Sequence, residues 1–140
     1  GSMKAFVAGK AREGVDSANS MSVTAIEAVA ALCDFFAKNG AGKVVPKNTT
    51  SACKRVCMFL RWMVRTGSPV DLGLWADIID RRSLIMPLDT HVVQEACKMG
   101  LLSSRTASMA TARRLTDAML EVFPDDPLKG DFALFGLGVE

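Results

Sequence analysis

Asp89 combines a reactive side chain with a place at the start of a predicted helix, and a predicted helix that carries Lys54 lies upstream of it. Asp89 follows an apolar run that ends at Pro87, which breaks regular structure. Its carboxylate can accept hydrogen bonds from the free N–H groups of a first helical turn. This position predicts either a helix cap or a positioned catalytic acid.

The helix that must position Lys54 is predicted over residues 52–65, and it has two different faces. Apolar residues recur at helical spacing along one face: Cys53, Val56, Cys57, Leu60, Met63 and Val64. Lys54, Met58, Arg61 and Arg65 fall together on the opposite side. Such a basic stripe is typical of a solvated surface, and the alternative is a surface that faces phosphates.

Helical patterns and helix boundary signals recur along the rest of the chain. The capping box of Thr24 and Glu27 starts one helix, and Asn39-Gly40 ends it. Further helices are predicted over residues 4–12, 71–80, 89–100 and 108–122, and after Asp126-Pro127 through Phe132, Phe135 and Leu137. No convincing alternating strand and no internal repeat is found. The sequence therefore predicts an all-α protein, a compact helical domain of about five to seven helices.

Length and composition limit the class of protein. The 140 residues suit one domain, with residues 1–21 as a tag scar and an N-terminal extension or short helix, and 22–140 as a single helical domain. No apolar run approaches the roughly 18 to 20 residues of a membrane span, so we expect no membrane partner. The net charge of +2 is compatible with nucleic acid without requiring it. Four cysteines without a C-x-x-C pair, and a single histidine, predict buried thiols in a reducing cytosol and no metal site.

Three stretches of the sequence resemble known proteins. Residues 87–92, Pro-Leu-Asp-Thr-His-Val, resemble the Asp-Thr-His segment of the helix–hairpin–helix DNA glycosylase superfamily. Residues 51–65 and the ending at 131–138 look like the C-terminal half of an uncharacterised bacterial family. That family is distantly similar to the archaeal type of 8-oxoguanine DNA glycosylase/lyase. The resemblance covers roughly residues 50–139.

The resemblance implies a helix–hairpin–helix glycosylase-like fold over residues 52–140, and an activity. It implies a DNA glycosylase/AP lyase that removes oxidised purines in base-excision repair, in the bacterial cytoplasm at the nucleoid. Lys54 matches the lysine nucleophile, Asp89 matches the assisting aspartate, and double-stranded DNA with a damaged base is the partner. No cofactor is implied. Two departures are the absence of a Gly-x-Gly hairpin before Lys54 and a shorter N-terminus, and a homodimer would complete a base pocket that is incomplete there.

A DNA substrate would need further residues around Lys54 and Asp89. The side chains expected to contact DNA are Arg55, Arg61, Arg65, Thr90 and His91. Trp62 and Trp75 are candidates for stacking on a flipped base, and core packing is the alternative for both. Two other functions fit the same sequence: a non-catalytic nucleic-acid-binding helical module and a helical protein-interaction domain.

Overall fold

The protein is all-α, as predicted. The computed structural model describes residues 2–13, 23–43, 45–46, 49–131, 133–134 and 136, with only the backbone given for 10–13. Five α-helices and one 3₁₀ turn follow in order: α1 Met3–Glu13, α2 Ala25–Lys38, α3 Lys54–Val64, η1 Arg81–Ser83, α4 Thr90–Lys98 and α5 Met109–Val122. Within the described ranges there is no strand, and two isolated bridges join Val23 to Ile79 and Ser51 to Ser108.

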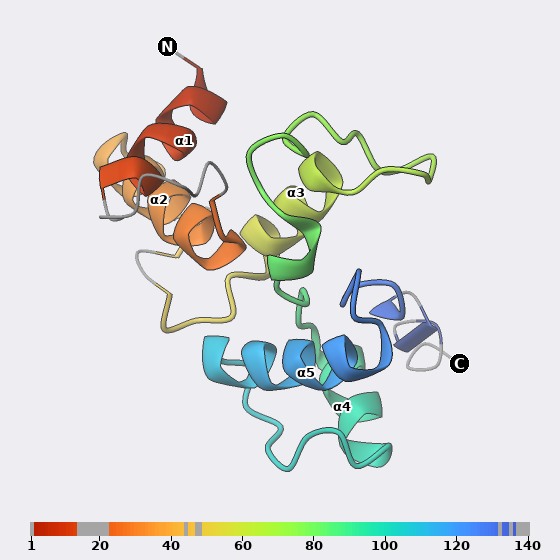
Figure 1. The fold of residues 1–140 in the computed structure, drawn as a ribbon. Coiled ribbons are helices and arrows are strands. Elements are labelled where there is room, and N and C mark those ends of the chain that lie inside the picture. The colour runs from red at the N-terminus through yellow and green to blue at the C-terminus, as the bar shows by residue number, and fades with distance from the viewer. Residues whose placement is uncertain are drawn as a thin grey trace.

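The helices gather in two groups. Figure 1 shows α1, α2 and α3 together at one end of the molecule and α4 and α5 at the other. α2 packs against both α1 and α3. The buried segment at 84–88 leads from η1 to α4 and connects the two groups. The start of α4 is therefore fixed by a segment that the core already holds.

Local sequence signals explain the helix boundaries. At the start of α2, Thr24 Oγ1 accepts from the Glu27 N–H at 3.4 Å, and Glu27 Oε2 accepts from the Thr24 N–H at 3.4 Å. The predicted capping box is therefore confirmed. Gly40 follows α2 with φ of +79°, a left-handed conformation that glycine adopts without strain. The predicted apolar face of α3 is also confirmed, because Val56, Cys57, Leu60 and Val64 are buried.

The helix predicted over residues 71–80 does not form. The N–H groups of Leu72 and Gly73 donate to the Trp62 carbonyl, and the N–H of Trp75 donates to the Met63 carbonyl. Gly73 also has φ of +64°, outside the right-handed helical region. In a helix over 71–80 the Trp75 N–H would donate to the Asp71 carbonyl, but it is bound to the end of α3, and only a turn at 74–78 remains. The prediction failed because a tertiary interaction took this hydrogen-bond donor.

The last predicted helix is described only in part. Residues 131, 133–134 and 136 are helical, while Phe132, Phe135 and Leu137 lie outside the described residues. Asp126 caps the turn that follows it and leads into this helix, because its Oδ1 accepts from the Leu128 N–H at 3.2 Å. No helix among the described residues is long and apolar enough to cross a membrane.

Candidate functional site

The structure brings Lys54 and Asp89 together. Lys54 is the first residue of α3, Asp89 is the N-cap of α4, and the Lys54 Nζ lies 3.6 Å from Asp89 Oδ2. The Lys54 side chain is 50% exposed and that of Asp89 is 16% exposed. An amine and a carboxylate that are distant in the sequence thus form an ion pair that solvent can reach.

The two carboxylate oxygens of Asp89 have different partners. Oδ1 accepts from the N–H of Val92 at 2.8 Å and caps α4, as predicted. Oδ2 faces the Lys54 amine. The buried segment before Asp89, including Pro87 and Leu88, fixes the backbone that presents both oxygens. The same carboxylate can therefore cap a helix and act on a group beside Lys54.

The start of α3 has an unusual backbone. The N-cap, Cys53, adopts the left-handed conformation with φ of +50° and ψ of +45°, which is uncommon for a residue other than glycine. Its N–H donates to Ser51 Oγ at 3.3 Å. The Cys53 side chain makes no capping hydrogen bond to the first turn of α3. The turn was not predicted from the sequence, because glycine is the usual residue in a left-handed conformation and no glycine stands directly before Lys54.

The beginnings of three helices lie close together around Lys54. α3 begins at Lys54, and the cap of α4 is its ion-pair partner. α5 begins beside the same segment, because the Met109 N–H donates to the Thr50 carbonyl at 3.2 Å. Helix N-termini carry partial positive charge and unsatisfied N–H donors. Side chains already cap two of these starts, Asp89 on α4 and Ser108 on α5, so the first turn of α3 is where an anionic group would find N–H donors.

Three of the residues expected to contact DNA flank the ion pair. Arg55 follows Lys54 in α3 and is exposed. Thr90 and His91 are the first two residues of α4, and both are exposed. Their side chains belong to the same two helix starts as Lys54 and Asp89, so a ligand at the pair lies within their neighbourhood.

Arg61 does not lie on a solvent-facing stripe, and the prediction that it does is wrong. The residue is 1% exposed. Its Nε and one terminal nitrogen donate to the two oxygens of Asp131 at 2.7 and 3.3 Å, and the other terminal nitrogen donates to Asp71 Oδ1 at 3.0 Å. Carboxylates from two distant segments therefore occupy its guanidinium.

Arg65 belongs to the same buried network. Its Nε and a terminal nitrogen donate to Asp126 Oδ2 at 3.1 and 2.8 Å, and its other terminal nitrogen lies 3.6 Å from Asp71 Oδ2. The side chain is 13% exposed. The solvated stripe was a wrong prediction here too, because the segments that contain Asp71 and Asp126 cover this side of α3. No local pattern in the sequence indicates these partners.

The two tryptophans have different environments. Trp75 is buried, and its ring meets that of Phe59 edge-on with centroids 5.3 Å apart. Core packing, the alternative given for Trp75, is therefore the environment that the structure shows. Trp62 is 43% exposed and lies next to an apolar loop that sequence reasoning missed.

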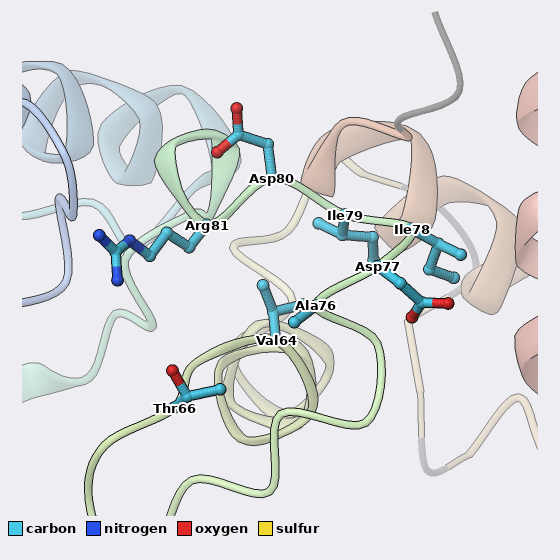
Figure 2. Close-up of a pocket in the computed structure, with 8 residues that line it drawn as sticks. All are labelled: Val64, Thr66, Ala76, Asp77, Ile78, Ile79, Asp80 and Arg81. Atoms are coloured by element: carbon cyan, nitrogen blue, oxygen red, sulfur yellow. The ribbon is translucent and has the colours of Figure 1, made fainter.

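A cavity of about 390 Å³ lies where α3 ends, between that helix and residues 76–81. Figure 2 shows Val64 and Ala76 close together at its centre, with Asp77, Asp80 and Arg81 extending outward. The Lys4 ammonium beside Asp77 lowers the pKa of that carboxyl, and Arg82 lowers the pKa of Asp80. The residues that line the cavity offer two carboxylates and a guanidinium but no amine that could act as a nucleophile, in contrast to the pair of Lys54 and Asp89.

Metal ligands do not cluster in the described part of the chain. No group of three or more His, Cys, Asp or Glu side chains there could hold a metal ion. Burial raises the pKa of the Cys33 and Cys57 thiols to about 12, which keeps both protonated at neutral pH. A metal ligand would need the thiolate.

Comparison with known proteins gives a family. No curated protein and no solved structure is significantly similar to the chain. One family model matches residues 1–140, and its description reads "Protein of unknown function (DUF2400)". Since this match extends over all 140 residues, the chain belongs to the DUF2400 family.

Proposed function

We propose that the protein is a DNA glycosylase with AP lyase activity, acting on oxidised purines in double-stranded DNA in base-excision repair. Lys54 is the nucleophile, and Asp89 assists it. The observation that carries the proposal is the 3.6 Å separation between the Lys54 amine and the Asp89 carboxylate at two helix starts. The setting is the bacterial cytoplasm at the nucleoid, and a second copy of the chain completes the base pocket.

The chemistry needs both groups at one place. The unprotonated Lys54 amine attacks C1′ of the damaged nucleotide, the bond from C1′ to the base breaks, and the base leaves with a proton. The C1′–O4′ bond of the sugar ring then breaks, O4′ takes a proton and the Lys54 nitrogen loses one, which gives a Schiff base. Loss of a proton from C2′ then allows β-elimination, in which the bond from C3′ to the 3′ phosphate oxygen breaks. Asp89 Oδ2, 3.6 Å from the amine, stabilises the positive charge that develops on the sugar. Because Oδ1 is held by the Val92 N–H, the position of Oδ2 is fixed before DNA binds.

The surroundings of the pair suit a polyanion. The starts of α3 and α4 meet at the ion pair, the start of α5 is bonded to the segment before α3, and the N-cap residue of α3 makes no side-chain capping hydrogen bond. Arg55 adds a cation, and Thr90 and His91 add polar contacts at the surface. Arg61 and Arg65 are left out of this DNA contact, because Asp71, Asp126 and Asp131 bind them.

Borohydride trapping tests the proposed lyase. Wild-type protein is incubated with duplex DNA that contains 8-oxoguanine, with abasic duplex and with undamaged duplex, in the presence of borohydride. We expect a covalent protein–DNA adduct with the first two and none with the third. Lys54→Arg keeps the positive charge but cannot form this Schiff base, and should lose the adduct. Asp89→Asn keeps an oxygen for the cap and should lower trapping at least about tenfold, or about 1.4 kcal/mol of barrier.

Two outcomes would contradict the proposed chemistry. One is a wild-type protein that binds duplex DNA and gives no adduct with either damaged substrate. That result would favour a nucleic-acid-binding module without catalysis, whose affinity falls steeply as salt rises. The other is an adduct that forms equally well in Lys54→Arg, which would assign the amine to another residue.

A helical protein-interaction domain is the second candidate, and one exposed apolar patch favours it. The patch consists of Trp62, Val70, Leu72 and Leu74, which are 43%, 49%, 62% and 60% exposed. The N–H of Leu72 donates to the Trp62 carbonyl at 2.7 Å, so the loop is held against α3. Absence of DNA affinity at low salt, together with self-association that Leu72→Ser and Leu74→Ser abolish, would support this second function.

A further inference from the structure

Three buried cysteines lie behind the start of α3. Cys33 belongs to α2, Cys53 is the N-cap of α3, and Cys57 lies one turn further along α3. All three are reduced thiols that form no disulfide, and each is at most 2% exposed. None of them has a role in the proposed chemistry, so the cluster needs a separate explanation.

Two of these thiols face each other. Cys33 Sγ lies 4.0 Å from Cys53 Sγ, at hydrogen-bond distance for sulfur. Cys53 Sγ and Cys57 Sγ each donate to a carbonyl of their own segment, at Ser51 and Ala52, and of these two only Cys53 Sγ is also at hydrogen-bond distance from another of the described thiols. Cys97 lies elsewhere, where its Sγ donates to the Ser104 carbonyl at 3.6 Å. The juxtaposition therefore selects one pair that joins two helices.

We propose that Cys33 and Cys53 form an oxidisable dithiol, and that peroxides convert it to a disulfide that ties α2 to the start of α3. The two sulfur atoms must approach by about 2 Å to reach disulfide bond length. Rotation of the two side chains and a small shift of the turn before α3 can supply this movement. The proposal does not depend on the proposed DNA chemistry.

The reaction balances with one molecule of hydrogen peroxide. The Cys53 thiolate attacks one peroxide oxygen, the S–O bond forms, the O–O bond breaks, and hydroxide leaves and is protonated to water. The Cys33 thiolate then attacks the Cys53 sulfenic acid, the S–S bond forms, and the S–O bond breaks with release of a second water. Both sulfurs are oxidised and the peroxide is reduced.

The geometry also sets the order and speed of these steps. Burial raises the pKa of both thiols, Cys33 to about 12, so little thiolate exists at neutral pH. The hydrogen bond with Cys33 lowers the pKa of Cys53 and opposes the effect of burial there. Cys53 also lies two residues from the exposed Ser51. Cys53 is thus the first thiol to react, slowly, when the segment before α3 opens.

The disulfide would change the part of the chain that holds Lys54. It closes a loop between α2 and α3 and removes conformational freedom from the unfolded chain. It also fixes the strained residue that directly precedes Lys54. We expect the oxidised protein to melt roughly 10 °C higher than the reduced protein, from loop-closure entropy and the size of the domain.

The test uses the whole chain and hydrogen peroxide as the probe. After treatment and removal of peroxide, intact mass should fall by about 2 Da through loss of two hydrogens. Non-reducing digestion should then give a peptide pair joined at Cys33 and Cys53. Dithiothreitol should reverse both the mass change and the higher melting temperature.

Matched variants locate the bond. Cys57→Ala and Cys97→Ala should still form it, whereas Cys33→Ala and Cys53→Ala should not. The wild-type peptide map decides the question even where a variant folds poorly. A map that joins other cysteines, oxidation to sulfinic acid without a cross-link, or an oxidised protein that melts at the reduced temperature would each overturn the proposal.

Discussion

The two ends of α3 each hold basic side chains against carboxylates, and the two arrangements differ in burial. At the N-terminal end, Lys54 lies 3.6 Å from Asp89 with half of its side chain exposed. Toward the C-terminal end, Arg61 is 1% exposed and donates to Asp71 and Asp131 at distances from 2.7 to 3.3 Å. The first is a loose pair that solvent reaches, and the second is a buried network.

This difference separates a charge that holds the fold from a charge that can react. A guanidinium and its carboxylates that leave water together must bind each other closely, because an unpaired buried charge is costly. A single exposed ion pair contributes little to stability and leaves its amine free to exchange partners. Arg61 therefore holds the fold together, and Lys54 remains available for the proposed reaction.

The largest effect should come from breaking the buried network. Arg61→Ala leaves two carboxylates buried without their main partner, and we expect a loss of about 3 to 5 kcal/mol in the free energy of unfolding. Urea unfolding followed by circular dichroism measures this loss. Arg55→Ala, an exposed arginine on the same helix, is the matched control and should change stability by less than about 1 kcal/mol. Equal effects of the two substitutions would remove the distinction between the ends of α3.

Stability at alkaline pH tests whether burial, and not position along α3, decides how strongly an ionisable side chain affects the free energy of unfolding. Cys33 and Cys57 lie near the N-terminal end but are buried, and their pKa values are raised from 9.0 to about 12. Between these values the unfolded chain binds fewer protons than the folded protein, so the free energy of unfolding falls as pH rises. We expect a slope of about 1.4 kcal/mol per pH unit for each thiol. In Cys57→Ala the slope should fall by the contribution of one thiol, about 1.4 kcal/mol per pH unit. An unchanged slope would contradict the assignment of the pH dependence to the buried thiols.

Asp89 allows capping to be separated from its position beside the amine. Asp89→Ala removes the acceptor for the Val92 N–H, and we expect a loss of about 1 kcal/mol of stability. Asp89→Asn keeps an oxygen at the cap and should lose less than about half of that amount. Thermal unfolding of the two variants gives the comparison. If Asp89→Ala and Asp89→Asn lose the same stability, the negative charge of Asp89, and not its hydrogen bond to the Val92 N–H, stabilises α4.

The smallest effect on stability should come from Lys54. Lys54→Ala removes one partner of an exposed ion pair, and we expect a change of at most about 0.5 kcal/mol in urea unfolding. The same substitution should abolish borohydride trapping if the proposed lyase is correct. A large loss of stability would show that the pair at this end also holds the fold.

Much of the helical architecture could be predicted from the sequence, because its signals are local. The capping box at Thr24, the cap at Asp89 and the apolar face of α3 depend on residues within a few positions of each other. The turn after α3 could not be predicted in this way. Leu72, Gly73 and Trp75 donate their N–H groups to carbonyls of α3, and a partner that distant leaves no periodic pattern.

For the candidate site, the sequence determined that Asp89 would start a helix and that Lys54 would stand at the beginning of another. Only the tertiary structure decided that the amine of one meets the free oxygen of the other. It also decided which basic residues of α3 remain available, because Asp71, Asp126 and Asp131 come from segments that fold over one side of that helix. Helix caps arise from hydrogen bonds between neighbours in the chain, whereas burial and ion pairing depend on segments that only folding brings together.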